Sequence, residues 1–192
     1  MVPGRLAAIA ALMMVGACGS SPPTRFYTLD PVPPPHASTP GSGVPVQVGQ
    51  VTIPAALDRL SFVTRASPNR IEVSDQDRWA APLDTMIRRV LAANLGARMS
   101  GARVVMPGDP TPPGQVLTVM LNVREFVGDT QGKVQLDADW SVLDRNQHPL
   151  FTRQASITQE AGSGQAGPIA AAMSDALAEL SDQIAASIPA RR

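Results

Sequence analysis

The chain has 192 residues, of which 44% are hydrophobic and 17% charged, enough for one folded domain with an apolar core. Sixteen basic residues balance sixteen acidic ones, so the positive excess typical of nucleic-acid-binding proteins is absent and we expect no nucleic-acid partner. Two histidines and one cysteine are too few for a Cys/His metal cage or a disulfide framework, so we expect no metal site of that kind.

The start of the chain has the pattern of a secretory signal peptide. Arg5 precedes the uncharged residues 6–17, a run that is shorter than the roughly 20 residues needed to span a bilayer. The run ends at Val15-Gly16-Ala17-Cys18, which resembles the bacterial lipobox. We therefore predict a signal peptide over residues 1–17 and a Cys18 that carries a diacylglycerol and an N-acyl chain, with no other cofactor. A buried core cysteine after an uncleaved helix is the alternative.

Residue 19 and the segment after it predict how the domain is attached. Gly19 stands where an Asp would retain a lipoprotein in the inner membrane, so by analogy we expect an outer-membrane anchor that faces the periplasm. Residues 18–45 contain eight prolines and predict an extended tether and loop. Strand-forming residues interrupt it at 25–29, where we expect a short strand docked on the domain; a linker throughout is the alternative.

The sequence becomes typical of a globular domain from residue 46, and we assign a domain to 46–190. Alternating apolar residues and turn signals predict strands over 46–53, 61–65, 70–74 and 103–106, with a single helical turn over 54–59. Apolar residues at helical spacing predict a helix over 82–97, ended by Gly96 and Gly101.

The second half of the domain reads as three long strands followed by a helix. We expect the strands over 115–127, 133–143 and 150–158, joined by turn-rich connections as an antiparallel meander, and the helix over 167–187. Because strands and helices are segregated along the chain, we predict an α+β fold with a mainly antiparallel sheet and two amphipathic helices packed on one face.

Two patterns resemble active sites, and we assign neither to catalysis. Residues 162–167 fit G-x-G-x-x-G, but no second strand and acidic residue follow the helix as a dinucleotide site requires, which favours a flexible glycine loop. Asp137 and Asp139 share a strand face and could form an acid/base or metal pair, but the solvated face of a strand explains the same alternation. We predict that the protein is not an enzyme.

The entrance of the first helix contains a tryptophan that two interpretations fit. Trp79 lies between Asp77-Arg78 and the helix that opens at Pro82-Leu83. It could close the core below the first helical turn, since large aromatic residues dominate core energetics. It could instead be an exposed anchor at an interface, where Trp and Arg are enriched.

An ordered series of short motifs gives the chain its resemblance to a known family. The series is the lipobox Cys18, Phe26-Tyr27-Thr28-Leu29, Val51-Thr52-Ile53-Pro54, Leu57-Asp58-Arg59, Arg78-Trp79-Ala80 and Pro82-Leu83. Over about residues 24–188 it resembles the ABC-type transport auxiliary lipoprotein family. The resemblance marks Tyr27, Leu29, Pro54, Leu57, Asp58, Arg59, Arg78, Trp79, Pro82 and Leu83 as structural or interface residues of the family.

The resemblance also implies a function without catalysis. It implies a component of a transport system that moves lipids or other hydrophobic cargo between the inner and outer membranes. The implied partners are an MCE-domain periplasmic protein, whose tunnel the lipoprotein docks, and its inner-membrane transporter; the lipoprotein itself is implied to be a ring-like homo-oligomer. A structural lipoprotein of a secretion or lipopolysaccharide-assembly complex is the main alternative. A periplasmic hydrolase that uses Asp137 and Asp139 is a third.

Overall fold

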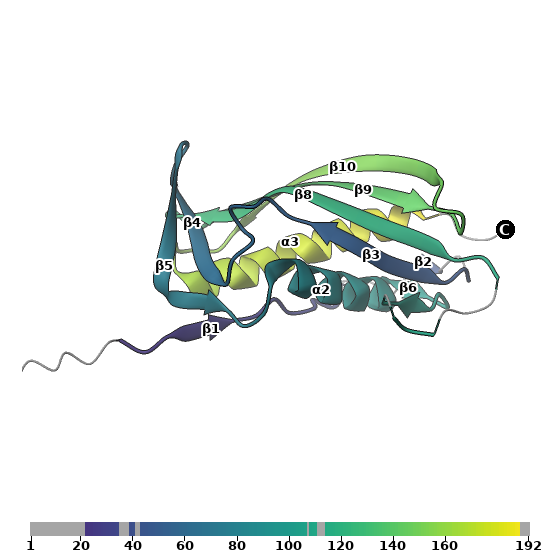
Figure 1. Ribbon diagram of the computed structural model, residues 1–192, viewed down its shortest axis with the longest axis horizontal. Helices are drawn as coiled ribbons and strands as arrows, with labels where there is room; N and C mark the ends of the chain where they lie inside the picture. The colour runs from purple at the N-terminus through teal and green to yellow at the C-terminus, as the bar shows by residue number, and fades with distance from the viewer. Residues whose placement is uncertain (1–21, 35–38, 41–42, 107, 111–113, 189–192) are drawn as a thin grey trace, which may run out of the picture.

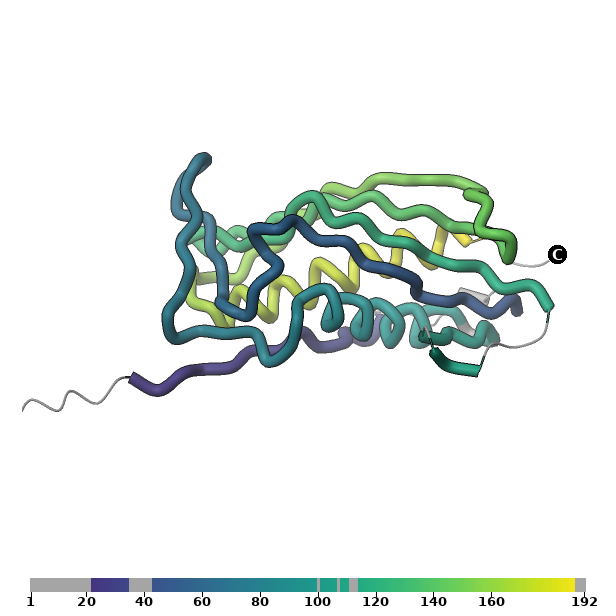
Figure 2. Tube along the Cα trace, viewed as in Figure 1, coloured from purple at the N-terminus to yellow at the C-terminus, as the bar shows by residue number. Residues whose placement is uncertain are grey.

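The computed structural model describes residues 22–34, 39–40, 43–106, 108–110 and 114–188, and the predicted signal peptide and Cys18 lie outside them. Two helices run side by side along the long axis of the molecule below a curled sheet (Figures 1 and 2). The elements are β1 (Arg25–Tyr27), β2 (Thr39–Pro40), β3 (Val46–Thr52), β4 (Ser61–Ser67), β5 (Arg70–Trp79), α2 (Leu83–Arg98), β6 (Met99–Ser100), β7 (Val104–Val105), β8 (Leu117–Asp129), β9 (Lys133–Leu143), β10 (Pro149–Glu160) and α3 (Ala166–Ser187).

The sheet is mixed, so the prediction of a mainly antiparallel sheet is wrong in this detail. The predicted meander is present, because β8, β9 and β10 pair antiparallel in chain order, as do β4 and β5. Four further pairs are parallel, namely β1 with β5, β3 with β7, β3 with β8, and β4 with β8. Parallel partners lie far apart in the sequence, and no turn signal marks them.

Strand β8 organises the sheet because two strands share one of its edges. Residues 117–122 of β8 pair with β3, residues 128–129 pair with β4, and β9 takes the other edge over nearly the whole length. Along this edge of β8, the pairing with β3 therefore ends before the pairing with β4 begins. The chain between β3 and β4 makes the turn at 54–57. The hairpin of β4 and β5 extends away from the body of the sheet at one end of the molecule (Figure 1).

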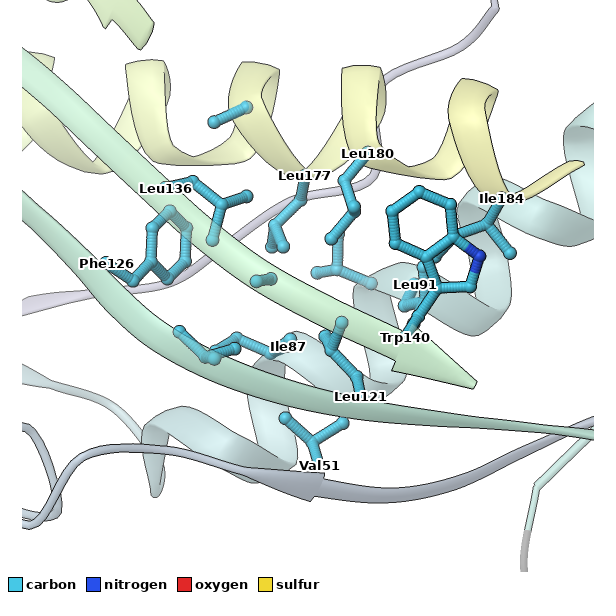
Figure 3. Packing of buried hydrophobic residues seen from close by; sticks show 14 of the residues in the cluster. Val51, Ile87, Leu91, Leu121, Phe126, Leu136, Trp140, Leu177, Leu180 and Ile184 are labelled. Atoms are coloured by element: carbon cyan, nitrogen blue, oxygen red, sulfur yellow. The ribbon is translucent and has the colours of Figure 1, made fainter. Parts of the chain in front are cut away.

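The core lies between the sheet and the two helices, as the predicted α+β class requires. In β9 every second residue is buried, and its apolar side chains face α3. Figure 3 shows this layer, with side chains from β8 and β9 meeting those of both helices; the labelled members are Val51, Ile87, Leu91, Leu121, Phe126, Leu136, Trp140, Leu177, Leu180 and Ile184. Each such side chain contributes about 1.5–3 kcal/mol when it leaves water.

Part of the N-terminal segment that we assigned to the tether and loop packs on the domain. The docked strand is confirmed as β1, which pairs with the end of β5. Residues 28–34, which we call the strap, then run along the helices (Figure 1). In the strap Leu29 is fully buried in the core, and the backbone N–H of Asp30 donates to Ser174 Oγ of α3 at 3.1 Å.

Helix α2 holds the strap through two buried polar residues. Asn94 Oδ1 accepts the backbone N–H of Val32 at 3.0 Å, and Arg98 Nη1 donates to the carbonyl oxygen of Val32 at 3.0 Å. The Arg98 side chain is only 3% exposed, and its Nε donates to Asp182 of α3 at 2.7 Å. The same guanidinium therefore joins the strap and both helices. Among the described residues, no helix is both long and apolar enough to cross a membrane.

Candidate functional site at the hairpin end

Most of the family-motif residues gather at one end of the domain, where β1, β4, β5 and the start of α2 meet. Three aromatic rings fill the interior of this end: the Tyr27 and Phe62 ring centroids lie 5.7 Å apart, and those of Phe62 and Trp79 lie 4.6 Å apart. Trp79 is only 4% exposed, so it is a core residue, and the interpretation as an exposed interface anchor does not hold for the folded domain. Leu83 begins α2 directly behind it and is also buried.

Asp77 is the centre of a polar network on the rim of this aromatic cluster. Its Oδ1 accepts from Arg25 Nε at 2.8 Å and from the Tyr27 hydroxyl at 3.0 Å. Its Oδ2 accepts from Arg25 Nη2 at 3.2 Å and from Ser74 Oγ at 3.0 Å. The carboxylate thus binds β1 to β5 through a two-point contact with a guanidinium, which fixes both position and orientation.

Ser74 also shapes the backbone that places Asp77. The β4–β5 register shifts here, because Ser61 pairs with Arg78 but Val63 already pairs with Val73. The extra β5 residues form a turn in which Ser74 Oγ accepts the backbone N–H of Asp77 at 2.9 Å. Such side-chain contacts to a nearby backbone N–H compete with regular strand pairing. We predicted that this strand ends at residue 74; it instead bends there and continues to Trp79, where it pairs with β1.

The network changes the acidity of its members. Partial burial alone would raise the pKa of Asp77, but the hydrogen bonds from Arg25, Ser74 and Tyr27 outweigh it, and the pKa lies below its ordinary value. Burial and the hydrogen bond to Asp77 raise the pKa of Tyr27. The network is therefore in one charge state, carboxylate with neutral phenol, throughout the neutral range.

Asp77→Asn is expected to destabilise the domain by about 1–3 kcal/mol at pH 7, because it leaves the partly buried donors with a weaker acceptor. The free energy of unfolding of the wild-type domain also depends on pH. A carboxyl whose pKa is lower in the folded state stabilises the fold above its unfolded pKa of about 3.9, and this contribution is lost as the pH falls through the folded pKa. Thermal melts between pH 7 and pH 3 should therefore show a smaller loss of stability in Asp77→Asn than in wild type. Asp75→Asn, an exposed neighbour, is the control and should behave as wild type; equal acid sensitivity of wild type and Asp77→Asn would contradict the assignment.

A cavity of about 570 Å³ opens beside this network. One wall carries Arg25, Asp77 and Glu72, and another is the loop at the start of α3, Gly164 to Pro168. This lining mixes charged, polar and apolar residues and so differs from the mainly apolar pockets that hold lipids or other hydrophobic molecules.

The glycines of the 162–167 loop, part of which lines this cavity, are explained by close packing. A Cβ at Gly164 would lie 2.3 Å from the backbone oxygen of Thr130, and one at Gly132 would lie 2.7 Å from the backbone oxygen of Ser163. The two loops therefore approach each other more closely than any residue with a Cβ atom would allow at these positions. We predicted flexibility for the 162–167 loop; its glycines instead permit close packing against the turn between β8 and β9. After this loop, α3 runs from Ala166 to Ser187.

The other motif residues divide into buried and exposed positions. The predicted turn at 54–59 is present, with the N–H of Leu57 donating to the Pro54 carbonyl oxygen at 2.9 Å. Leu57 is half-buried against the core, whereas Asp58 and Arg59 are exposed. A small groove of about 120 Å³ separates this turn from the β4–β5 hairpin. Arg78 and Pro82 are also exposed, so the motif combines an interior cluster with a polar surface.

Asp137 and Asp139 do not form a shared site. Asp137 accepts from Gln135 Nε2 at 2.9 Å, and Asp139 faces Arg124 at 3.5 Å. Each carboxylate therefore has its own partner on the outer face of β9. Within the described ranges, no three Cys, His, Asp or Glu residues lie close enough together to hold a metal ion.

Sequence reasoning found Tyr27, Leu29 and Trp79 but missed Arg25 and Ser74. Both are polar residues at strand positions, and their partner Asp77 lies 52 and 3 positions away in the sequence. The sequence signal that could have found Ser74 is its place three residues before Asp77, the spacing of a side-chain-to-backbone turn. No local signal relates Arg25 to Asp77.

Comparisons with known proteins agree on a family. The model of the family described as "ABC-type transport auxiliary lipoprotein component" matches residues 27–185. The intermembrane transport lipoprotein PqiC of Escherichia coli strain K12 is 31% identical over 143 residues, which are 74% of this chain and 75% of PqiC. The protein of the same name from Shigella flexneri gives the same values.

Two solved structures share the fold. A crystal structure of an uncharacterized protein aligns with a TM-score of 0.71 and 21% identity, covering 88% of this chain and all of the other. A crystal structure of protein XCC0632 from Xanthomonas campestris aligns with a TM-score of 0.64 and 16% identity, covering 83% of this chain and 92% of the other. At these identities the likeness concerns the fold alone.

Proposed function

Because the chain belongs to the family of ABC-type transport auxiliary lipoprotein components, we propose that it serves an MCE-type transport system as its lipid-anchored, periplasm-facing outer-membrane component. Such a system moves lipids or other hydrophobic cargo between the inner and outer membranes. The observation that carries the proposal is the family match from Tyr27 to residue 185, together with the similarity to PqiC, whose name describes intermembrane transport. The family is not a family of enzymes.

The role we propose within that system is docking rather than chemistry or carriage. The core between the sheet and the helices is filled by packed side chains (Figure 3), and the cavity of about 570 Å³ beside the Asp77 network is lined by charged, polar and apolar residues together. An acyl chain would need a mainly apolar pocket. The single domain is therefore better suited to hold the end of a partner's tunnel, as part of a ring of identical subunits, than to enclose a lipid itself.

The partner is tested by affinity purification of the full-length lipoprotein, with a C-terminal tag, from detergent-solubilised membranes. Mass spectrometry is expected to find an MCE-domain protein together with its inner-membrane permease and ATPase, and the purified lipoprotein is expected to have the mass of a homo-oligomer. Recovery of a secretion pore or a lipopolysaccharide-assembly complex in place of the MCE protein would contradict the proposal and support the assembly alternative.

Cys18→Ala is expected to release the protein from the membrane. The mature chain would lose its acyl chains, each contributing about 0.8 kcal/mol per buried CH₂ group, and stable anchoring requires more than one chain. After cell fractionation, we expect wild type in the outer-membrane fraction. We expect Cys18→Ala in the soluble fraction or as the unprocessed precursor. Ser20→Ala, two residues away, is the matched control and should remain anchored. Retention of Cys18→Ala in the outer membrane would contradict lipidation at this residue.

A further inference from the structure

The length of chain between the anchor and the folded domain limits where the domain can lie, an argument that rests on the proposed lipidation of Cys18. The fold holds the chain from Arg25 onward, through the Asp77 network and then through the strap, where Leu29 is fully buried. Only residues 19–24 separate Cys18 from β1. Seven Cα–Cα steps span at most about 25 Å. The residues of the folded domain that lie close to β1 therefore also lie close to the bilayer.

Exposed apolar side chains are concentrated at this same end. Among the described residues, five large hydrophobic side chains are exposed, and four of them belong to β1, to β5 or to the residue before β4: Phe26 at 65%, Leu60 at 45%, Ile71 at 44% and Val73 at 41%. The fifth, Leu150, is the second residue of β10, and this strand begins near the turn from β9 at the opposite end of the molecule (Figure 1). Val73 lines the cavity beside the Asp77 network and Ile71 lines the groove beside the 54–57 turn, so the four side chains share one end of the molecule without forming a single patch.

Phe26 is the most exposed of these side chains and the nearest to the anchor. Its neighbour Tyr27 turns inward to Phe62, and side chains alternate along a strand, so Phe26 points away from the core. Its register partner on β5 is Arg78, which is exposed on the same face. The Arg25 side chain, one position earlier, is 61% exposed. The Arg25 guanidinium is already bound to Asp77, so Arg78 is the cation beside the Phe26 ring. An apolar ring beside a guanidinium group suits a phospholipid surface, since the ring enters the headgroup boundary and the guanidinium group pairs with phosphate oxygens.

We propose that the β1–β5 corner is the part of the domain that contacts the bilayer, with Phe26 inserted among the phospholipid headgroups and Arg78 beside it at the phosphates. The lipid anchor and Phe26 then hold the domain at two points, so that it stands in a defined orientation on the membrane. The exposed carboxylates Asp58 and Asp75 lie at the same end and offset the positive charge of Arg78. The contact with the bilayer therefore depends on the aromatic ring more than on net charge.

Tryptophan fluorescence in the lipidated full-length protein tests this contact. Phe26→Trp places a reporter at the corner, and Leu150→Trp is the matched control at the opposite end. The native Trp79 and Trp140 are 4% and 2% exposed and give the same background in both variants. Each variant is reconstituted into phosphatidylethanolamine and phosphatidylglycerol vesicles that contain phosphatidylcholine brominated near the headgroup end of its acyl chains. Flotation confirms that the protein is bound to the vesicles.

The proposal expects brominated lipid to quench the Phe26→Trp emission and to leave the Leu150→Trp emission unchanged. Flotation without quenching of Phe26→Trp would overturn the contact while leaving the anchor intact. Protection of Phe26→Trp from aqueous acrylamide without quenching by brominated lipid would also overturn it, because protein would then cover the ring. Failure to float would overturn lipid anchoring, and this inference with it.

Discussion

Replacing Trp79 with alanine is expected to lower the free energy of unfolding by about 3–5 kcal/mol, the usual cost of removing a buried large aromatic side chain. The indole packs on Phe62, so the substitution leaves a cavity where β1, β4 and β5 meet. The backbone N–H of residue 79, which donates to the Leu60 carbonyl oxygen at 2.7 Å, is kept in the variant. For a domain of this size the midpoint of thermal unfolding should fall by roughly 6–20 °C. Circular dichroism of the purified variant provides the measurement.

Arg78→Ala is the matched control for this substitution. Arg78 precedes Trp79 on the same strand but is exposed, so its loss should change stability by less than about 0.5 kcal/mol. A Trp79→Ala variant that melts like wild type and differs only in oligomeric mass would contradict the core assignment and revive an interface role.

Gly164→Ala is expected to destabilise the domain by about 1–3 kcal/mol or more, because an overpacked contact forces neighbouring groups apart. The new methyl group would meet the backbone of Thr130 on three atoms, the nearest at 2.3 Å, and backbone cannot move aside as a flexible side chain can. The strain would separate the turn after β8 from the loop that begins α3. Chemical denaturation should show an earlier midpoint with an unchanged slope.

Gly167→Ala, three residues further on, separates this steric effect from a general effect of removing glycine. A Cβ at Gly167 would meet only Tyr27 Cε1, at 3.6 Å, which is an ordinary contact. Gly167 also lies inside α3, where alanine is favoured over glycine by up to about 1 kcal/mol. Gly167→Ala should therefore be neutral or stabilising. Equal destabilisation by both substitutions would contradict the close-packing account.

The elements that could be predicted from the sequence are those that carry their own periodicity. Strand β9 alternates buried and half-buried or exposed residues along its length, and its predicted bounds, 133–143, are those observed. Both helices were located within one residue at each end, because their apolar stripes recur at helical spacing. The antiparallel meander followed from the turns that join its strands.

The parallel pairings and the strap could not be predicted, because their partners are distant in the sequence. Asn94 reads as a member of the apolar face of α2, and only the structure shows that its amide accepts a strap N–H. Residues 18–45 were predicted to be an extended tether and loop apart from the strand at 25–29, yet Val32 is held by α2 and Val44 is buried. Residues 35–38 and 41–42 lie outside the described part.

The candidate site shows the same division. Trp79, Leu29 and Leu83 could be found as apolar residues in short motifs, although the sequence left Trp79 between two roles. The Asp77 network could not be found, since its Arg25 contact joins residues 52 positions apart. Local patterns thus identified the apolar interior of the site, and tertiary geometry supplied its polar rim.

The length of α3 has a consequence for how this protein can be handled in experiments. Its 22 residues, at 1.5 Å of rise each, make a spacer of about 33 Å along the long axis of the domain. β1 lies near one end of this spacer, and Ile188, the last described residue, lies at the other (Figure 1). In the orientation proposed above, a fluorophore attached at Ile188 would therefore report on the end of the molecule that points away from the tether, where a partner could approach without meeting the membrane.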